Sequence, residues 1–583
     1  MPTLEWIGKS KVINHHQEVP FRVLERQYSY DEQGQHEEDN GSENMIIRGD
    51  NLEALKALLP RYEGRVKCIY IDPPYNTGNE GWVYNDNVND PKIKKWLGEV
   101  VGKEGEDLTR HDKWLCMMYP RLKLLQKLLA EDGVIFISID DTEYANLKLI
   151  CDEIFGSNCF VSNISWQRTY STRNDSKGIV NEVEHLVVYS KQPDWNPNKL
   201  PRTAEMDAKY KNPDNDRTLW RTDNAFAPGA ATHQGMVYAI QHPFTGKMLY
   251  PSNGACWRYQ QDQMLEIMRG WCGYELRDLN DAHERAVVCG VPESDVRQGV
   301  QAIVLSESLE ISAQKAQAVY DRGQWPRFFF TKGGKGGIAR KTYLENVGGK
   351  LPTNFWAFTE TGHTDEAKKE MLAIFDGKAT FDTPKPHRLI EFVLKVAGNE
   401  NALVLDSFAG SGTTAHAVLN MNKSDGGHRK FILVEMMDYA DSITAERVKR
   451  VIRGYGEGKN AVEGTGGNFS FYDLGEPLLV GDCLNEAVAP EKIREYIWFM
   501  ETKTPYAPPA GDNPYYLGQH NSTGYYFYYE PQRVTVLDYA FLATIKEKAD
   551  GTVIYADRCS IGEDKLAQMG ITFKKIPRDI SRL

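Results

Sequence analysis

The sequence lacks the cysteine pairs, long apolar runs and targeting segments that mark several classes of protein. None of its nine cysteines forms a Cys-x-x-Cys pair, so we expect no metal site and no disulfide framework, but reduced and mostly buried thiols. No apolar run is long enough to cross a bilayer, and residues 1–12 match neither a signal peptide nor a transit peptide. We therefore expect a cytosolic protein without a membrane partner.

Positive charges are outnumbered by negative ones, with 69 Lys and Arg residues against 81 Asp and Glu residues. The 583 residues carry a net charge of −12, with 41% apolar and 26% charged residues. This balance is ordinary for a globular protein and argues against a uniformly basic, nonspecific nucleic-acid binder. It does not exclude a DNA enzyme with a local positive groove. The length predicts roughly three to four domains.

Strand and helix patterns alternate in two separate stretches, which predicts a doubly wound α/β fold. The first holds strands at 66–71 and 134–139 and helices at 114–130 and 144–155, and the second holds a helix at 387–397 and strands at 402–405 and 431–434. Polar residues at 27–43 predict an irregular arm, and the polar stretch 78–112 predicts a mobile loop over a site. The predicted divisions are an arm at 1–43, α/β halves at 44–190 and 353–467, an inserted domain at 191–352 and a small α/β module at 468–583.

A rigid turn follows the first of these buried strands. Asp72-Pro73-Pro74-Tyr75 comes directly after the β-branched run 66–71, and the two prolines fix φ at successive positions. The turn thus holds a carboxylate and an aromatic ring at the carboxyl end of a strand, where open α/β sheets bind their ligands. The alternative is an acidic surface turn without chemistry.

A second strand ends in a glycine-rich loop, Asp406 to Thr414. Gly410 and Gly412 allow the backbone to approach a ligand closely before a helix begins. The loop has no Gly-x-x-x-x-Gly-Lys-Ser/Thr pattern and no dinucleotide spacing, which argues against a phosphate site. Glu435 ends the next strand, where it could accept hydrogen bonds from ribose. These features predict a nucleoside-bearing cofactor without phosphate.

Two further stretches allow more than one interpretation. Asp50 and Asn51 precede a helix and could either cap it or face a cofactor. In the inserted domain, a segment without acidic residues carries aromatic residues, glycines and five cations, which are Arg327, Lys332, Lys335, Arg340 and Lys341. It is typical either of a DNA phosphate contact with stacking or packing rings, or of a solvated hairpin tip.

Together, Phe408-Ala409-Gly410-Ser411-Gly412 and Asp72-Pro73-Pro74-Tyr75 resemble the motifs of the DNA methyltransferases that modify amino groups with S-adenosyl-L-methionine. The catalytic motif comes first, as in the circularly permuted β class. The finer resemblance is to the modification subunits of type III restriction–modification systems, over about residues 44–190 and 350–450. The motifs that carry it are Arg48 to Leu52, Asp72 to Gly78, Thr364 to Glu370 and Phe381 to Pro386.

The resemblance implies roles for individual residues. Asp72 is the catalytic carboxylate within the turn that includes Pro73 and Pro74, and Tyr75 stacks on a base flipped out of the duplex. The implied cofactor-binding residues are Asp50, Asn51, Lys385, Asp406, Phe408, Gly410, Gly412, Thr413 and Glu435. Among these, Asp50 is expected near the adenine, Glu435 near the ribose and Asp406 near the methionine.

The expected function is methylation of the exocyclic N6 amine of adenine at specific sites in duplex DNA. Aspartate at position 72 resembles adenine-specific enzymes, while cytosine-amino enzymes more often carry serine. The alternatives are cytosine-amino methylation, a noncatalytic DNA-recognition subunit, or an RNA or protein methyltransferase. The implied setting is bacterial or archaeal restriction–modification or phage defence. A restriction subunit is an implied partner, because the chain shows no helicase or nuclease motif. The module at 468–583 is expected to serve dimerisation or the docking of a partner subunit.

Overall fold

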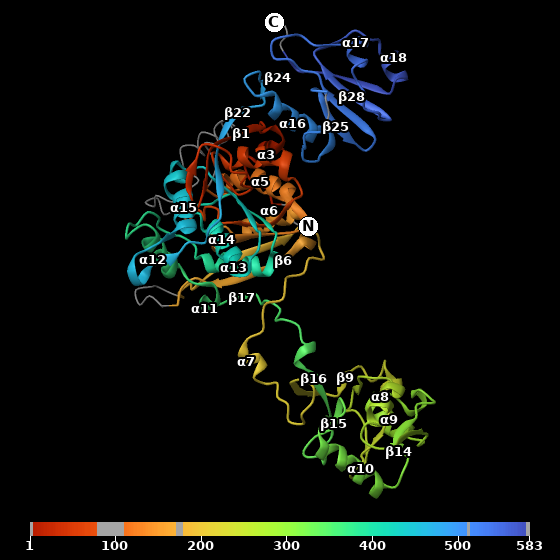
Figure 1. Ribbon diagram of the computed structural model, residues 1–583. Coiled ribbons are helices and arrows are strands. Elements are labelled where there is room, and N and C mark those ends of the chain that lie inside the picture. Colours follow the sequence, from red (N-terminus) through yellow and green to blue (C-terminus); the bar gives the residue numbers. More distant parts are fainter. Residues whose placement is uncertain (1–3, 78–109, 171–178, 510–512, 579–583) are drawn as a thin grey trace. The chain divides into compact units, whose positions relative to one another are not determined.

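The computed structural model describes residues 4–77, 110–170, 179–509 and 513–578 (Figure 1). The chain divides into two compact units, one comprising residues 1–198 and 352–583 and the other residues 199–351. The predicted start of the inserted domain, residue 191, differs from this boundary. The chain as far as Asn198 stays with the first unit, where its amide N–H donates to the carbonyl of Val396 at 2.8 Å. The predicted loop 78–112 lies almost wholly outside the described residues.

The first unit is built on an eleven-stranded sheet (Figure 1). Across the sheet its strands are β17 (Phe355–Trp356), β6 (Phe160–Gln167), β7 (Val183–Ser190), β5 (Leu129–Ile139), β4 (Val66–Ile71), β18 (Leu403–Asp406), β19 (Lys430–Glu435), β3 (Met45–Arg48), β22 (Phe469–Pro477), β1 (Arg22–Asp31) and β2 (Gly34–His36). The six strands from β5 to β22 run parallel. The predicted α/β class is therefore confirmed.

Helices cover both faces of this sheet. They are α3 (Asn51–Tyr62), α5 (Arg110–Leu128), α6 (Tyr144–Phe155), α12 (Thr364–Ile374), α13 (His387–Ala397), α14 (Thr413–Asp425) and α15 (Glu446–Arg453). Helices α3, α5 and α6 share one buried apolar cluster with Ile135 and Ile137 of β5. Phe136 points to the opposite face because side chains alternate along a strand, and it meets α13 through Trp356 and Phe392. Burial on both faces explains why the central strands are almost entirely apolar.

The sheet order places the two motif-bearing strands side by side. Cys68 and Ile69 of β4 pair with Val404 and Leu405 of β18, although more than 300 residues separate them. Strand β19 lies on the other side of β18, and β3 lies beyond β19. The turn after β4 and the loop after β18 therefore emerge from neighbouring carboxyl ends.

The prediction of an irregular arm at 27–43 is wrong for residues 27–31 and 34–36, which lie in strands. Residues 22–31 form β1, which pairs with β22 near the other end of the sequence, and Tyr28 stacks on Phe471 with ring centroids 5.1 Å apart. Because β22 also pairs with β3, residues 469–477 belong to the central sheet rather than to the predicted module 468–583. More than 400 residues separate β1 from β22 in the sequence, so local sequence alone gave no signal for their pairing.

The second unit is mostly short strands around an aromatic core. Its sheets have the orders β11-β10-β14-β13, β15-β16-β8 and β12-β9. The strands are β8 (Trp220–Asn224), β9 (Phe226–Pro228), β10 (Ile240–Gln241), β11 (Met248–Leu249), β12 (Ala255–Trp257), β13 (Tyr274–Arg277), β14 (Ala302–Leu305), β15 (Phe328–Phe330) and β16 (Ile338–Tyr343). The longer helices are α8 (Gln261–Met268), α9 (Ala282–Cys289) and α10 (Leu309–Arg322). Trp220, Trp257, Trp271 and the three phenylalanines of β15 fill its core.

The carboxyl-terminal segment contains a four-stranded sheet in the order β25-β26-β28-β30. Its main elements are α16 (Pro490–Thr502), β25 (Tyr516–His520), β26 (Thr523–Phe527), β28 (Gly551–Ala556), α18 (Glu563–Gln568) and β30 (Ile571–Lys575). The short helix α17 (Tyr539–Leu542) also belongs to this segment. Among the described residues, no helix combines the length and the apolar character needed to cross a membrane.

Candidate active site

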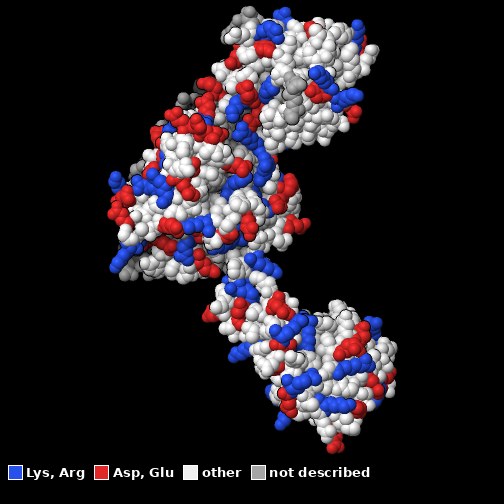
Figure 2. All heavy atoms as spheres, viewed as in Figure 1, with Lys and Arg blue, Asp and Glu red and all other residues white. Residues whose placement is uncertain are grey.

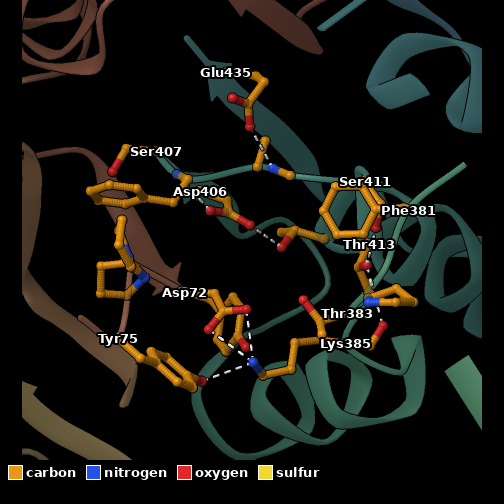
Figure 3. Close-up of a pocket in the computed structure, with 18 of the residues that line it drawn as sticks. Asp72, Tyr75, Phe381, Thr383, Lys385, Asp406, Ser407, Ser411, Thr413 and Glu435 are labelled. Carbon is orange, nitrogen blue, oxygen red and sulfur yellow. Dashed lines mark hydrogen bonds and ion pairs between the residues drawn. The ribbon is translucent and has the colours of Figure 1, made fainter. Parts of the chain in front are cut away.

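A cavity of about 400 Å³ opens where β4, β18 and β19 end (Figure 3). Most of the residues predicted to act together line it, namely Asn51, Asp72, Pro73, Pro74, Tyr75, Lys385, Asp406, Phe408, Gly410, Thr413 and Glu435. The predicted residues Asp50 and Gly412 are not among its lining. The parallel register of β4 and β18 thus gathers the two distant motifs around one space.

The turn after β4 is fixed from both sides. The indole N–H of Trp114 in α5 donates to the carbonyl of Pro74 at 2.7 Å. On the other side the Tyr75 hydroxyl donates to Glu184 of β7 at 3.2 Å. These contacts leave the Asp72 carboxylate at the cavity wall, with its side chain 26% exposed.

Lys385, which was predicted to bind the cofactor, forms an ion pair with Asp72. Its ammonium donates to both Asp72 oxygens at 2.9 and 2.8 Å and to the Tyr75 hydroxyl at 2.8 Å (Figure 3). Burial lowers the pKa of Lys385, but the neighbouring carboxylates of Asp72 and Glu184 outweigh it and raise the pKa overall. Lys385 is therefore a cation placed against the turn that holds Asp72 and Tyr75.

Two further carboxylates hold the glycine-rich loop by its backbone. Asp406 accepts from the N–H of Phe408 at 3.0 Å and from the Thr414 hydroxyl at 2.6 Å. Glu435 accepts from the N–H of Gly410 at 2.8 Å. Burial raises the pKa of each carboxyl to about 7. Glu435 also accepts from the N–H of Met437 at 3.0 Å, so backbone donors hold both carboxylates where they line the cavity.

Gly412 shapes the loop from behind the cavity. Its φ is +81°, and an added Cβ would lie 2.9 Å from the carbonyl oxygen of Thr444. The Thr444 hydroxyl in turn donates to the carbonyl of Gly410 at 2.6 Å. Only glycine fits this position without displacing the loop.

Asp50 and Asn51 have different roles. Asp50 caps α3 by accepting from the backbone N–H groups of Leu52 and Glu53 at 2.9 and 3.2 Å, which is the capping interpretation of the sequence. It also pairs with the buried guanidinium of Arg121 at 3.2 Å. Asn51 lines the cavity and donates to the carbonyl of Ser407 at 3.2 Å.

Sequence reasoning missed several residues that support the cavity. Glu184 lines it and pairs with Arg168 at 2.8 Å. Arg121 lines it as well, although α5 carries this arginine within an otherwise apolar face. Neither residue belongs to a recognisable motif, and both reach the cavity only through the packing of α5 and the pairing of β7 with β5.

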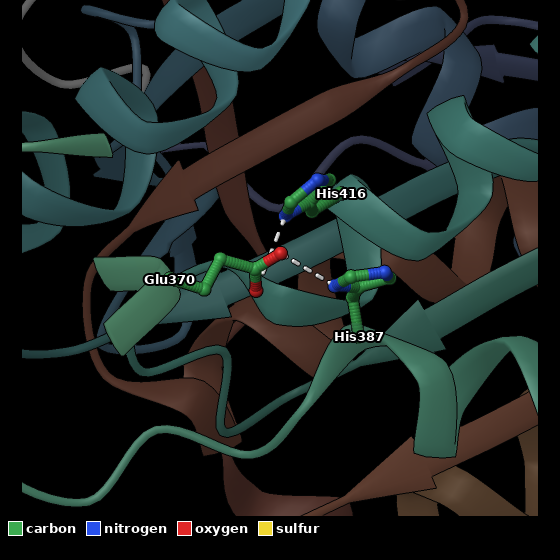
Figure 4. Close-up of side chains that lie close together, drawn as sticks. All are labelled: Glu370, His387 and His416. Carbon is green, nitrogen blue, oxygen red and sulfur yellow. Dashed lines mark ion pairs between the residues drawn. The ribbon is translucent and has the colours of Figure 1, made fainter. Parts of the chain in front are cut away.

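A cluster behind the loop offers atoms that could hold a metal ion. Potential ligand atoms of Glu370, His387 and His416 lie within 4.8 Å of one another (Figure 4). The buried guanidinium of Arg447 contacts Glu370 and the Nδ1 of His416, both at 3.1 Å. Since this cation already contacts two of the three residues, the cluster fits an internal ion-pair network better than a metal site. Arg447 also donates to the hydroxyls of Ser411 and Thr413 at 2.9 and 2.8 Å, so the network braces the loop.

The site's two motifs lie within a family match. The profile of the family described as "DNA methylase" matches residues 66–446, which is most of the chain and includes both halves of the cavity. This chain belongs to that DNA methylase family.

Several relatives of the methylase carry modification functions in their names. The type III restriction-modification enzyme StyLTI Mod subunit of Salmonella typhimurium is 33% identical over 71% of this chain and 58% of that protein. The EcoPI Mod subunit of Escherichia phage P1 is 31% identical over 74% of this chain and 63% of that protein. The type II methyltransferase M.KpnI of Klebsiella pneumoniae is 30% identical over 68% of this chain and 81% of that protein. The methylase thus spans about three fifths of the length of the two Mod subunits.

The basic segment of the methylase's second unit differs from its prediction. Lys341 is fully buried, pairs with Asp214 and Asp216, and donates to the carbonyl of Trp325 at 2.7 Å. Arg340 pairs with Asp223 at 2.5 Å with only 17% of its side chain exposed. The prediction of Lys341 as a phosphate contact is wrong, because its charge is satisfied inside the unit, and Arg340 is largely engaged as well.

Three of the five cations remain at the surface. Arg327, Lys332 and Lys335 are exposed, and Arg327 donates to the Tyr259 hydroxyl at 2.7 Å. The phenylalanines at 328–330 are buried in the core, so they pack rather than stack on bases. On the face shown in Figure 2, acidic and basic side chains alternate over this unit.

Proposed function

We propose that this methylase transfers the methyl group of S-adenosyl-L-methionine to the N6 amine of adenine in duplex DNA, as the modification subunit of a type III restriction–modification system. The observation that carries the proposal is the placement of Asp72 and Tyr75 beside the cavity that Asp406 and Glu435 line. The names of the Mod relatives support the type III assignment.

The donor set of the cavity fits this cofactor. Asp72, Asp406 and Glu435 present three carboxylates to one space, and the sulfonium and ammonium groups of S-adenosyl-L-methionine are both cations. Burial raises the pKa values of Asp406 and Glu435 to about 7, so each carboxyl would be stabilised by a partner that favours its charged form. Bound cofactor would supply those partners, together with an electrophilic methyl group.

The chain's own residues would prepare the amine. An adenine amine is a weak nucleophile because its lone pair is conjugated with the ring. Asp72 and the carbonyl of Pro73 can accept its two N–H groups and so favour lone-pair density on nitrogen. Tyr75 would stack on the flipped base. Holding the amine in line with the methyl group contributes much of the rate.

Partners and cellular location follow from the same proposal. Duplex DNA would be read by the second unit, and exchange of residues 199–351 with those of a relative should change the methylated sequence. The carboxyl-terminal segment would serve a homodimer or a restriction subunit. The reaction would take place in a bacterial or archaeal cytoplasm, where the duplex is accessible.

The direct test is incubation of the protein with labelled S-adenosyl-L-methionine and unmethylated duplex DNA, followed by mass spectrometry of the nucleosides. We expect N6-methyladenine in duplex DNA and no label in RNA or protein. N4-methylcytosine instead would assign the cytosine-amino alternative. Absence of any methylated product, with DNA binding intact, would identify a noncatalytic recognition subunit.

A further inference from the structure

Lys385 occupies the hydrogen-bonding position that the target amine needs. Its ammonium lies 2.9 and 2.8 Å from the two oxygens of Asp72 and 4.9 Å from the centre of the Tyr75 ring. These are the carboxylate and the ring that the proposed function assigns to the amine and to its base. An ammonium and an exocyclic amine present similar N–H donors, so both compete for the same acceptors.

A second acceptor lies next to the first. Glu184 places a carboxylate oxygen 3.5 Å from the Lys385 ammonium, which is just beyond a strong hydrogen bond. Glu184 is held in place by Arg168 at 2.8 Å and by the Tyr75 hydroxyl at 3.2 Å. A shift of less than about 1 Å would therefore bring Lys385 into hydrogen-bonding range of Glu184.

We propose that Lys385 is a placeholder for the target amine: it holds Asp72 in the DNA-free enzyme and moves to Glu184 when the amine enters. Lys385 and Glu184 are then positioning residues that act through Asp72. This inference rests on the proposed function, because it requires an amine as substrate.

The local charges do not oppose this exchange, because the balance of charge around the site stays the same. Asp72 and Glu184 contribute two negative charges, and Lys385 and Arg168 contribute two positive charges. The exchange moves the ammonium between two carboxylates without changing this balance. A water molecule in place of Lys385 would leave two neighbouring anions in a largely buried site, which would favour protonation of Asp72. A protonated Asp72 accepts the amine less well, so Lys385 also keeps the acceptor ionised until the base arrives.

The experiment compares single-turnover methyl transfer between about pH 6 and pH 9, with saturating S-adenosyl-L-methionine and unmethylated duplex DNA. The variants are Lys385→Met, Lys385→Arg and Glu184→Gln, with Lys395→Met on the exposed face of α13 as the matched control. Calorimetric binding of S-adenosyl-L-methionine shows that each variant is folded.

Lys385→Met should approach the wild-type rate at high pH and lose up to about tenfold per unit as the pH falls, because Asp72 then takes up a proton. Lys385→Arg should keep the wild-type profile shape. Glu184→Gln should slow transfer about tenfold at every pH, because the displaced ammonium then loses its charged acceptor. A tenfold change corresponds to roughly one pK unit of interaction energy. Lys395→Met should match the wild type.

The outcomes separate this inference from the proposed function. If the wild type transfers methyl groups but Lys385→Met shows a uniformly lower rate with an unshifted pH profile, the lysine is merely structural and the placeholder is overturned alone. If Glu184→Gln is as fast as the wild type, the exchange is also overturned. A wild type that methylates no nucleic acid would overturn the proposed function, and the placeholder with it.

Discussion

The two units of the methylase differ in where their charged side chains lie and in what these side chains contact. Around the cavity, Asp72, Asp406 and Glu435 come from separate strands and converge on one space. In the second unit, Arg340 and Lys341 belong to one conspicuously basic segment, yet their charges are paired with Asp223, Asp214 and Asp216. The scattered charges thus converge on a site, while part of the concentrated cluster is neutralised internally.

The difference teaches that a run of like charges in a sequence is a weak guide to a binding surface. A strand alternates its side chains between two faces, so half of the cations on β16 must face the interior of the unit. Lys341 points inward and requires carboxylates there, because an unpaired buried charge is costly. Charges at the carboxyl ends of parallel strands can instead line a cavity, although burial there still raises the pKa of Asp406 and Glu435 to about 7.

The largest expected effect concerns the cavity. Asp72→Ala should slow methyl transfer by about 10³-fold, in the range of a positioned proton acceptor, while leaving cofactor affinity within a few-fold. Asp141→Ala, which removes an exposed carboxylate paired with His185, is the control. Single-turnover assays and calorimetry provide the two readouts. Full activity of Asp72→Ala would show that this cavity carboxylate takes no part in methyl transfer.

Replacing the buried Lys341 should lower the stability of the second unit rather than remove a DNA contact. Lys341→Met leaves the carboxylates of Asp214 and Asp216 without their cation, so we expect the free energy of unfolding to fall by about 3–5 kcal/mol. Lys335→Met removes an exposed cation and should change it by less than about 0.5 kcal/mol. Urea denaturation of the full chain measures both. Equal stability of the two variants would mean that Lys341 is not internally paired.

Two matched glycine-to-alanine substitutions can separate the effect of a steric clash in the cofactor loop from the effect of a positive φ alone. Gly412 and Gly377 share a φ of +81°, but an added Cβ meets the Thr444 carbonyl at 2.9 Å only at Gly412, and meets nothing within 4 Å at Gly377. Gly412→Ala should weaken S-adenosyl-L-methionine binding about tenfold or more, from strain of roughly 1–3 kcal/mol. Gly377→Ala should leave the affinity unchanged. Calorimetry that gave the same affinity for both would contradict the role of the loop.

Cofactor binding should depend on pH through the cavity carboxylates. Burial raises the pKa values of Asp406 and Glu435 to about 7, so a cofactor that binds their ionised forms must displace their protons at lower pH. Affinity should therefore fall as the pH drops from 8 to 6, by up to about tenfold per unit for each linked carboxyl. Without cofactor the sign reverses: the stability contribution of these protonated groups is lost as the pH rises through 7. Proton release measured in two buffers of different ionisation enthalpy tests this linkage, and pH-independent binding would contradict it.

The smallest effect should come from the exposed cations. Arg327→Gln, Lys332→Gln and Lys335→Gln should each flatten the logarithmic salt dependence of DNA binding by about one unit if they contact phosphates. Arg340→Gln is the matched control, because its charge is already paired with Asp223. Fluorescence anisotropy across a salt series measures the slopes. If a variant with all three of these substitutions keeps the wild-type slope, none of the three cations contacts a DNA phosphate.

The sequence by itself determined the local parts of the site. The apolar run 66–71 forms β4 with those bounds, and the helix predicted at 387–397 is α13 with those bounds, because burial periodicity and the flanking prolines act within a few residues. The glycine-rich loop follows its strand as predicted, since backbone freedom at Gly410 and Gly412 is also a local property.

Only the tertiary structure decided how these parts meet. The pairing of β4 with β18, the capture of Lys385 by Asp72 and the insertion of β22 between β3 and β1 join residues hundreds of positions apart. The burial of Lys341 likewise depends on Asp214, 127 residues earlier. Such contacts form because folding buries apolar surface and pairs charges across the whole chain, and no local pattern of residues records which distant partner each group will find.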